Sequence, residues 1–356
     1  MRTLPRLALL LLALLGCEHA APFGAESYGS NHPFQAGSPH RLTYNPGQDR
    51  APAWLPDESG IVYSFERTDR PDRDRCLGIL PPEGGQRIST ICDVVPAAAD
   101  STDVFTEPAT DAAGRLVYFT TSSLIRALTP ASAALLLSSR AGPPTVRTLV
   151  TFPYYASDTA PRHGAAQLRW LGTDALVYVA ERIGYEGHCK GCPLDSVRTG
   201  VAIDRLDLNQ TPPHVDVLPG TRFASSVAVG ATSDVIYYTL GGDSRVFRRI
   251  LSLGTDSTVF DFGGSGIARD VQVIGSRLVA VVGGNVSFGF DPTLGYTVQR
   301  DSGGPVHVVD LSTGADSILT PGSPAWRHPA LSPSGKRLVV EAYANGTSDL
   351  WEFDLP

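Results

Sequence analysis

Short apolar runs rich in β-branched residues recur along the chain, and each follows a cluster of turn residues. The two clearest copies, 50–63 and 327–340, share the order polar residue, Pro, small apolar residue, Pro, turn residues and β-branched run. Weaker copies lie between them, at 107–118, 167–178, 226–237 and 270–280. Aligned on the β-branched residue, successive copies are 43 to 60 residues apart. A repeat of this size built from short strands is typical of a propeller or a solenoid.

The apolar pattern inside one unit predicts four strands. In the fourth unit the runs cover residues 225–229, 235–240, 246–253 and 257–262, and Gly-containing turns separate them. Almost no stretch of the chain has the period of an amphipathic helix. Four strands per unit is the composition of a propeller blade. We therefore expect an all-β fold, a six-bladed β-propeller of four-stranded blades.

The last unit has one strand too few. It contains the runs 329–332, 337–343 and 349–355, and the run 40–44 near the other end of the chain resembles the outer strand that is missing. We expect this N-terminal strand to complete the last blade and close the ring. Closure removes the exposed sheet edges that an open ring would present.

Phrases of the first and last units carry a family resemblance. Residues 41–43 (Arg-Leu-Thr), 52–60 (Pro-Ala-Trp-Leu-Pro-Asp-Glu-Ser-Gly), 331–338 (Leu-Ser-Pro-Ser-Gly-Lys-Arg-Leu) and 349–355 (Asp-Leu-Trp-Glu-Phe-Asp-Leu) resemble the repeat of TolB-like, WD-related six-bladed propellers. In units three to five the Ser-Pro-Asp-Gly turn of that repeat has decayed. The resemblance implies the propeller fold for the whole mature domain. It is not specific for function, because this blade also occurs in exported binding proteins and as the non-catalytic part of peptidases.

The first residues have the layout of an export signal. Arg2 and Arg6 precede an apolar run over 7–15, which is too short to span a bilayer. Residues 14–17 (Leu-Leu-Gly-Cys) resemble the bacterial lipobox, which implies cleavage before Cys17 and lipidation of that residue. An ordinary signal peptide with a chance cysteine is the alternative. We expect three parts: a lipoprotein signal peptide with the lipobox cysteine (1–17), a flexible tether (18–39) and the β-propeller domain (40–356).

The net charge and the residue after Cys17 indicate where the protein is located and which classes of partner it binds. The formal net charge is -7, whereas a protein that binds nucleic acid needs a basic face. Glu18 follows the cysteine, and in enteric bacteria the absence of Asp there implies the outer membrane. We expect a monomeric, lipid-anchored protein of the bacterial envelope that contacts the membrane through its anchor only. Its partner would be an envelope protein or a peptidoglycan-associated one.

The four remaining cysteines fit an oxidising compartment. Cys76 and Cys92 flank a turn cluster of Pro and Gly, so strands folding back there would place the two sulfurs opposite each other, and we expect a cross-strand disulfide. Cys189 and Cys192 form a Cys-Lys-Gly-Cys motif, for which we expect a tight disulfide loop. A redox dithiol, or half a metal site with His188, is the alternative. No second ligand pair has the spacing of a zinc site, so we predict no metal.

The longest insertions are expected on one face of the ring, which we call the long-loop face. They cover residues 67–75, 181–200 and 283–304, and each lies between the second and third strands of a unit. The short linkers between first and second strands would lie on the opposite face. Long loops on a rigid scaffold are where function usually lies.

Charged residues just before each innermost strand would ring the mouth of the central channel. Mixed charge suits a polar ligand or a partner's peptide. The alternative is a water-filled channel whose residues merely tolerate solvent. The predicted binding residues are Asp49, Arg50, Glu107, Arg162, His163, Arg269, Asp270, Arg327 and His328.

No constellation in the sequence predicts catalysis. Residues 301–305 (Asp-Ser-Gly-Gly-Pro) match most of the nucleophile signature of chymotrypsin-like proteases, but the His and Asp contexts of that family are missing. We predict no catalytic residue, no cofactor, and a non-enzymatic scaffold that binds a protein through the long-loop face. The alternative is a propeller enzyme or binder acting on a polar small molecule or sugar at the channel mouth.

Overall fold

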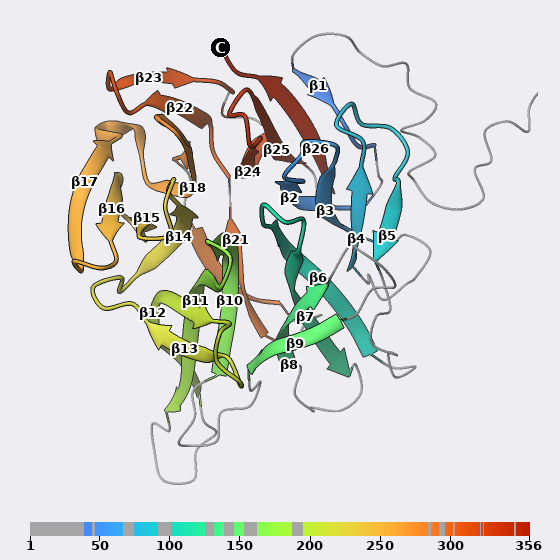
Figure 1. Ribbon diagram of the computed structural model, residues 1–356, viewed down its shortest axis with the longest axis vertical. Helices are drawn as coiled ribbons and strands as arrows, with labels where there is room; N and C mark the ends of the chain where they lie inside the picture. Colours follow the sequence, from blue (N-terminus) through green and yellow to red (C-terminus); the bar gives the residue numbers. More distant parts are fainter. Residues whose placement is uncertain are drawn as a thin grey trace, which may run out of the picture.

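The protein is a β-propeller in which the sheets follow one another around a central axis (Figure 1). The computed structural model describes residues 39–44, 47–66, 75–91, 101–124, 132–138, 146–152, 162–186, 195–283, 286–291, 296–301, 303–320, 322, 324–344 and 347–356. These residues contain no α-helix and one 3-10 turn, η2 (Gly263–Ser265). The prediction of an all-β propeller is therefore confirmed.

Four sheets of the described chain have four strands each. In three of them the strands run outward from the axis in chain order. The first contains β10 (Arg162–Leu171), β11 (Ala175–Glu186), β12 (Asp195–Asp207) and β13 (His214–Val217). The second contains β14 (Ala224–Val229), β15 (Val235–Leu240), β16 (Arg245–Ile250) and β17 (Thr255–Asp261). The third contains β18 (Ala268–Ile274), β19 (Arg277–Val282), β22 (Val306–Asp310) and β23 (Ala315–Ile318).

The fourth of these sheets joins the two ends of the described chain. It contains β24 (Ala325–Leu331), β25 (Arg337–Ala344), β26 (Thr347–Asp354) and β1 (His40–Arg41). His40 pairs with Glu352 and Arg41 with Trp351, and Arg41 Nη2 lies 2.7 Å from Asp349 Oδ2. The prediction that an N-terminal strand completes the last blade is confirmed.

The remaining large sheet has eight strands and differs from the expectation. It contains β2 (Asp49–Trp54), β3 (Ile61–Glu66), β4 (Arg75–Leu80), β5 (Ser89–Ile91), β6 (Ser101–Thr110), β7 (Leu116–Leu124), β8 (Ser132–Ser138) and β9 (Val146–Phe152). A single parallel pair, Arg75 with Val104, joins β4 to β6 because β6 begins early enough to run beside β4. The hydrogen-bonded sheets therefore do not divide into the six separate blades that the repeat predicts.

The strands nearest the axis share a β-bulge, in which a strand gains a residue over its partner. The register shifts within β2, β6, β10, β14, β18 and β24. In five of these strands the bulge holds a non-glycine residue with positive φ: Ala51, Glu107, Gln167, Asp270 and His328. A bulge bends its strand and redirects a side chain. In each inner strand the bulge therefore interrupts the regular alternation of side chains between the two faces of the sheet.

A repeated Trp–Arg contact joins neighbouring inner strands. Trp170 Nε1 of β10 donates to a main-chain oxygen of β6 at 3.1 Å, and the Arg115 guanidinium lies 4.4 Å from the centre of the Trp170 ring. Trp54 of β2 donates in the same way to β24 at 3.0 Å, under the guanidinium of Arg337. The same two residue types therefore hold two different junctions of the ring.

Most of the apolar core lies between consecutive sheets, and one cluster packs the two halves of the eight-stranded sheet together. One cluster joins Phe119 of β7 and Leu149 of β9 to Leu168 and Tyr178 of the next sheet. Each sheet is buried against both neighbours, so the ring is packed as one unit. This packing holds the inner strands, and the residues in their bulges, at fixed positions around the axis.

Candidate functional site

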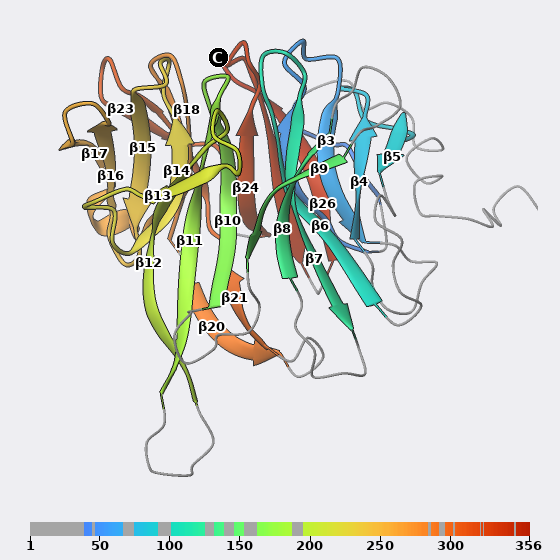
Figure 2. The same ribbon diagram turned by 60° about the horizontal axis from the view of Figure 1, so that its bottom comes forward.

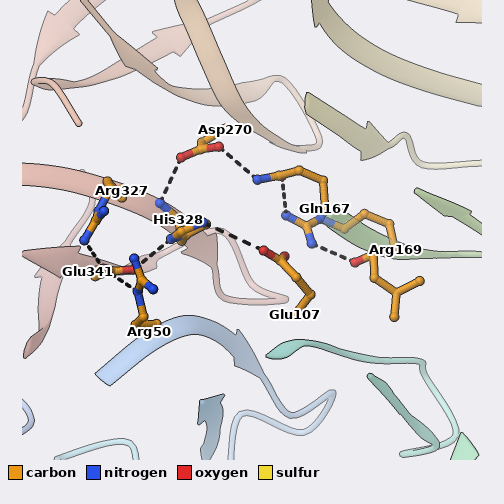
Figure 3. Close-up of polar contacts among 9 residues, drawn as sticks. Arg50, Glu107, Gln167, Arg169, Asp270, Arg327, His328 and Glu341 are labelled. Carbon is orange, nitrogen blue, oxygen red and sulfur yellow. Dashed lines mark hydrogen bonds and ion pairs between the residues drawn. The ribbon is translucent and has the colours of Figure 1, made fainter. Parts of the chain in front are cut away.

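The bulges of the inner strands bring polar side chains together in the central channel (Figure 3). Glu107, Gln167, Asp270 and His328 have φ of 52°, 58°, 48° and 47°. A non-glycine residue in this region costs roughly 1–3 kcal/mol and needs support from its surroundings. Strain of this kind clusters at functional sites, and here it recurs at equivalent positions of four strands. These residues, with Arg50, Arg169, Arg327 and Glu341, are called the channel network below.

Glu341 of β25 is the centre of one half of the network. Its carboxylate is fully buried and accepts hydrogen bonds from Arg327 Nη2 at 2.6 Å and from Arg50 Nε at 3.4 Å. Its other oxygen lies 2.7 Å from His328 Nδ1. Burial alone would raise the pKa of Glu341, but the charges of Arg50 and Arg327 and the hydrogen bond from His328 hold that pKa well below its usual value.

His328 is the link between the two halves. Burial works against its charged form, but the hydrogen bond to Glu341 and the charges of Glu341, Asp270 and Glu107 raise the pKa of His328 to about 9. The imidazolium therefore carries its proton at neutral pH and donates from Nδ1 to Glu341. Its Nε2 lies 3.8 Å from Glu107 Oε1, an ion pair longer than a hydrogen bond.

The other half runs from Asp270 to Arg169. Asp270 accepts hydrogen bonds from the main-chain nitrogen of His328 at 3.1 Å and from Gln167 Nε2 at 2.9 Å. Gln167 Oε1 accepts from Arg169 Nη2 at 3.1 Å, and Arg169 Nη1 donates to Leu168 O at 2.7 Å. Burial lowers the pKa of Arg169, and the charges of Glu107 and Asp270 oppose that shift. A continuous chain of polar contacts thus crosses the channel.

Water access is uneven across the network. Asp270, Gln167 and Arg327 are buried, whereas 24% of the Arg50 side chain, 21% of His328 and 12% of Glu107 are exposed. Arg50, His328 and Glu107, with the partly buried Arg169, are the members of the network that water reaches. A polar ligand could therefore contact Arg50, His328 and Glu107.

The structure brings together five of the predicted binding residues: Arg50, Glu107, Asp270, Arg327 and His328. They lie inside the inner strands rather than before them as expected, because the strands start earlier than the apolar pattern indicates. Whether they bind a ligand stays a prediction.

The other predicted binding residues are elsewhere. Arg269 is 2% exposed, and its Nη2 donates to the main-chain oxygens of Gly283 and Gly303 rather than into the network. Asp49 is fully buried. Arg162 and His163 begin β10, and their side chains lie outside the described part.

Sequence reasoning missed Gln167, Arg169 and Glu341, although two signals were available. Gln167 is the first residue of the copy 167–178, in register with Glu107 and Asp270 of the neighbouring copies. Glu341 interrupts the apolar run 338–342, and a carboxylate in such a run is buried only when it is paired. The repeat alignment, applied to side chains, would have identified Gln167.

Two of the predicted long loops contain regular strands. Most of the segment 181–200 forms the C-terminal end of β11 and the start of β12, which pair as far as Glu186 with Asp195. The segment 283–304 contains β20 (Val286–Asp291) and β21 (Tyr296–Asp301), which pair only with each other. These insertions are therefore ribbons, because both of their sides have the alternating residues that form a ladder. Residues 67–74 of the third insertion lie outside the described residues.

Most of the predicted export features lie outside the described residues. This holds for the signal segment with Cys17 and for Cys92, Cys189 and Cys192. Cys76 is buried in β4 and is disulfide-bonded, but its bond to Cys92 stays a prediction, as does the bridge of the other pair. Nowhere in the described chain is there a helix with the length and apolar character of a membrane span. Within the same ranges, no three His, Cys, Asp or Glu side chains gather in a way that could hold a metal ion.

Comparison with known proteins supports the fold. No family model and no curated protein matches the chain. Among solved structures, the gluconolactonase XC5397 from Xanthomonas campestris is 17% identical with a TM-score of 0.54, and the match covers 89% of each chain. The WD40 repeats of RRP9 are 12% identical with a TM-score of 0.51, over 89% of this chain and 97% of that one.

TolB from Acinetobacter baumannii also matches, with 15% identity and a TM-score of 0.48. The match covers 87% of this chain, which spans 64% of the length of that TolB. A gluconolactonase and a WD40-repeat protein, which have different names and roles, are about equally similar to this protein. The likeness establishes a β-propeller fold and assigns no activity.

Proposed function

We propose that the protein is a non-enzymatic binding scaffold of the bacterial envelope, and that its long-loop face holds a protein partner. The observation that carries this proposal is a pair of ribbons that project from one face of the ring (Figure 2). β10 pairs with β11 as far as Ile183, whereas β11 and β12 stay paired to Glu186 and Asp195. The second ribbon is the hairpin of β20 and β21.

The ribbons suit a recognition surface for a physical reason. They extend from the ends of β11 and β19, two second strands held by the packed ring, so their bases are fixed. Backbone groups at the edge of a two-stranded ribbon can pair with an added strand of a partner, and a rigid base lowers the entropy lost on binding. On the opposite face the described residues include short turns such as 230–234 and 332–336.

The lipid anchor is the part of the proposal that places the protein at the envelope. It is supported by the sequence alone, through Arg2, Arg6, the apolar run 7–15 and Cys17. An anchor at Cys17 with a tether to about residue 39 would let the ring stand off the bilayer. The expected site is the outer membrane.

We further propose that the ring consists of six blades, two of which form the eight-stranded sheet. The support is the bulge that recurs in β2, β6, β10, β14, β18 and β24. The eight-stranded sheet contains two of these bulged inner strands, and one parallel residue pair joins its halves. Each half then corresponds to one repeat of the sequence.

A pull-down from solubilised envelope tests the scaffold. The bait is the mature domain, compared with a variant in which residues 182–199 are replaced by a short Gly-Ser link. The matched control changes the opposite face by Thr232→Ala and Ser233→Ala, both in an exposed turn. We expect a stoichiometric partner with the wild type and the control, and its loss with the ribbon variant. A partner retained by all three forms, or captured by none, contradicts the proposal.

A second function, binding of a polar small molecule in the channel, is favoured by a different observation. Arg50, His328 and Glu107 keep water access within a largely buried polar network. This function does not depend on the ribbons. Its test is the ligand titration described below.

A further inference from the structure

Arg50 has hydrogen-bonding capacity that none of the described residues uses. Its Nε donates to Glu341 at 3.4 Å, and no described residue accepts from Nη1 or Nη2. A guanidinium has five N–H donors in a planar fork, which matches a carboxylate through two parallel hydrogen bonds. Because 24% of its side chain is exposed, the free edge of Arg50 can reach a ligand in the channel.

Glu107 has complementary capacity on the other side of His328 (Figure 3). It forms an ion pair with His328 Nε2 at 3.8 Å, beyond hydrogen-bond distance, and its charge also acts on Arg169. An ionised carboxylate accepts several hydrogen bonds. Glu107 can therefore accept from a hydroxyl or an ammonium group, and the bulge at φ 52° holds it toward the channel.

The charge of the network selects an anion. Arg50, Arg169, Arg327 and His328 supply four positive charges against the three carboxylates of Glu107, Asp270 and Glu341. One positive charge is left over, and the pairing of Glu341 with three cations leaves Arg50 as the cation with a free edge. Because most of the network is buried, that excess attracts an anion more strongly than it would on the surface.

We propose that Arg50, His328 and Glu107 form a binding site for a small carboxylate anion that carries a hydrogen-bond donor, a hydroxyl, ammonium or amide N–H group, next to its carboxylate. The carboxylate pairs with the fork of Arg50 and with the charged edge of His328, and the neighbouring donor binds Glu107. The buried pair Arg327 and Glu341 orients His328 and Arg50. This inference rests on the second function above, ligand binding in the channel, and does not involve the ribbons.

The ligand could be free in solution or could be the C-terminal end of a peptide, because both offer this chemistry. Isothermal titration of the mature domain with lactate, with triglycine and with triglycine amide distinguishes them. Binding of lactate and of triglycine, but not of the amide, is expected if the carboxylate is the recognised group. Binding of triglycine alone assigns the site to a chain end, and binding of lactate alone assigns it to a free acid.

Two further probes test each half of the ligand. Propionate lacks the hydroxyl of lactate, so we expect weaker binding than for lactate, by about tenfold for one lost hydrogen bond to a charged group. Glu107→Gln is expected to remove most of that difference. Glucose has hydroxyls without a carboxylate: its binding in place of lactate would overturn the carboxylate class while leaving channel binding in place.

Variants of Arg50 test whether this residue binds the carboxylate of the ligand. Arg50→Gln is expected to abolish lactate binding, and Arg50→Lys to retain part of it, because Lys keeps the charge without the fork. Arg41→Gln is the matched control, since Arg41 pairs with Asp349 on β26 at a comparable exposure of 33%. Circular dichroism checks that each variant is folded, and Arg50→Lys keeps the test valid if Arg50→Gln is not. Unchanged binding in Arg50→Lys, or no saturable binding of any probe to the wild type, overturns the proposal.

Discussion

Two Arg–carboxylate pairs of this protein have the same chemistry and opposite surroundings. Glu341, in the channel, is fully buried and lies 2.6 Å from Arg327 Nη2. Asp243, in the turn between β15 and β16, is 19% exposed and lies 2.7 Å from the Nη2 of Arg245, whose side chain is 47% exposed. The two N–O distances are nearly equal, so distance does not decide how much each ion pair contributes to the stability of the fold. Burial does, because loss of water strengthens the attraction and makes an unpaired charge costly.

The comparison distinguishes ion pairs that stabilise the channel from ion pairs at the surface. Glu341 pairs with three cations at once, and each would lose a partner without it. Asp243 neutralises one cation that water already solvates. The energetic value of an ion pair in this ring therefore depends on how deeply the pair is buried.

The largest effect is expected for Glu341→Gln. The change leaves Arg327, Arg50 and His328 without their shared carboxylate, and breaking a buried pair in this way costs about 3–5 kcal/mol. Urea unfolding followed by fluorescence measures the free energy of unfolding. A loss smaller than about 1 kcal/mol, the value of a surface pair, would show that water reaches Glu341.

A pH series tests the same network without a mutation. The folded pKa of His328, about 9, is above its usual value of 6.5. Its contribution to stability is therefore complete below pH 6.5 and is lost as the pH rises through 9, by roughly 3 kcal/mol. Unfolding free energies at pH 6, 8 and 10 measure this loss. His328→Gln should flatten the profile in that window, and an equal fall in wild type and variant would assign the loss to another group.

A neutral buried contact should have an intermediate effect. Trp170→Phe removes the hydrogen bond to the main-chain oxygen of Ala109 and leaves that oxygen unsatisfied between two sheets. The expected loss is about 1–3 kcal/mol. Trp54→Phe, at the equivalent junction, should match it in urea unfolding. If only one of the two variants were destabilised, the junctions would not be equivalent despite their shared geometry.

The smallest effect is expected at the surface pair. Asp243→Asn removes a charge that solvent screens, so the urea midpoint should not shift measurably. The same variant is the control for Glu341→Gln, since both replace one carboxylate by an amide. Similar losses from the two variants would remove the distinction between channel and surface pairs.

Much of the fold follows from local patterns. Turn clusters and β-branched runs predict the strands, and the match of 40–44 to an outer strand predicts the closure that β1 and β26 form. The joining of β4 to β6 could not be predicted from the sequence. One parallel residue pair between two segments does not change the apolar pattern of either strand. The extent of the ribbons did not follow either, since an insertion between two strands has the same length whether or not its sides pair.

The sequence by itself determined the repeat, the all-β class and the charged residue types near the axis, because these depend on composition and spacing within a unit. Only the tertiary structure decided which of those residues meet. Glu341 lies on a second strand and reaches Arg50, 291 positions away in the chain, because ring closure sets the first and last inner strands side by side. The bulges then turn Glu107, Asp270 and His328 toward the axis. A local pattern specifies neither event, since each depends on packing between sheets.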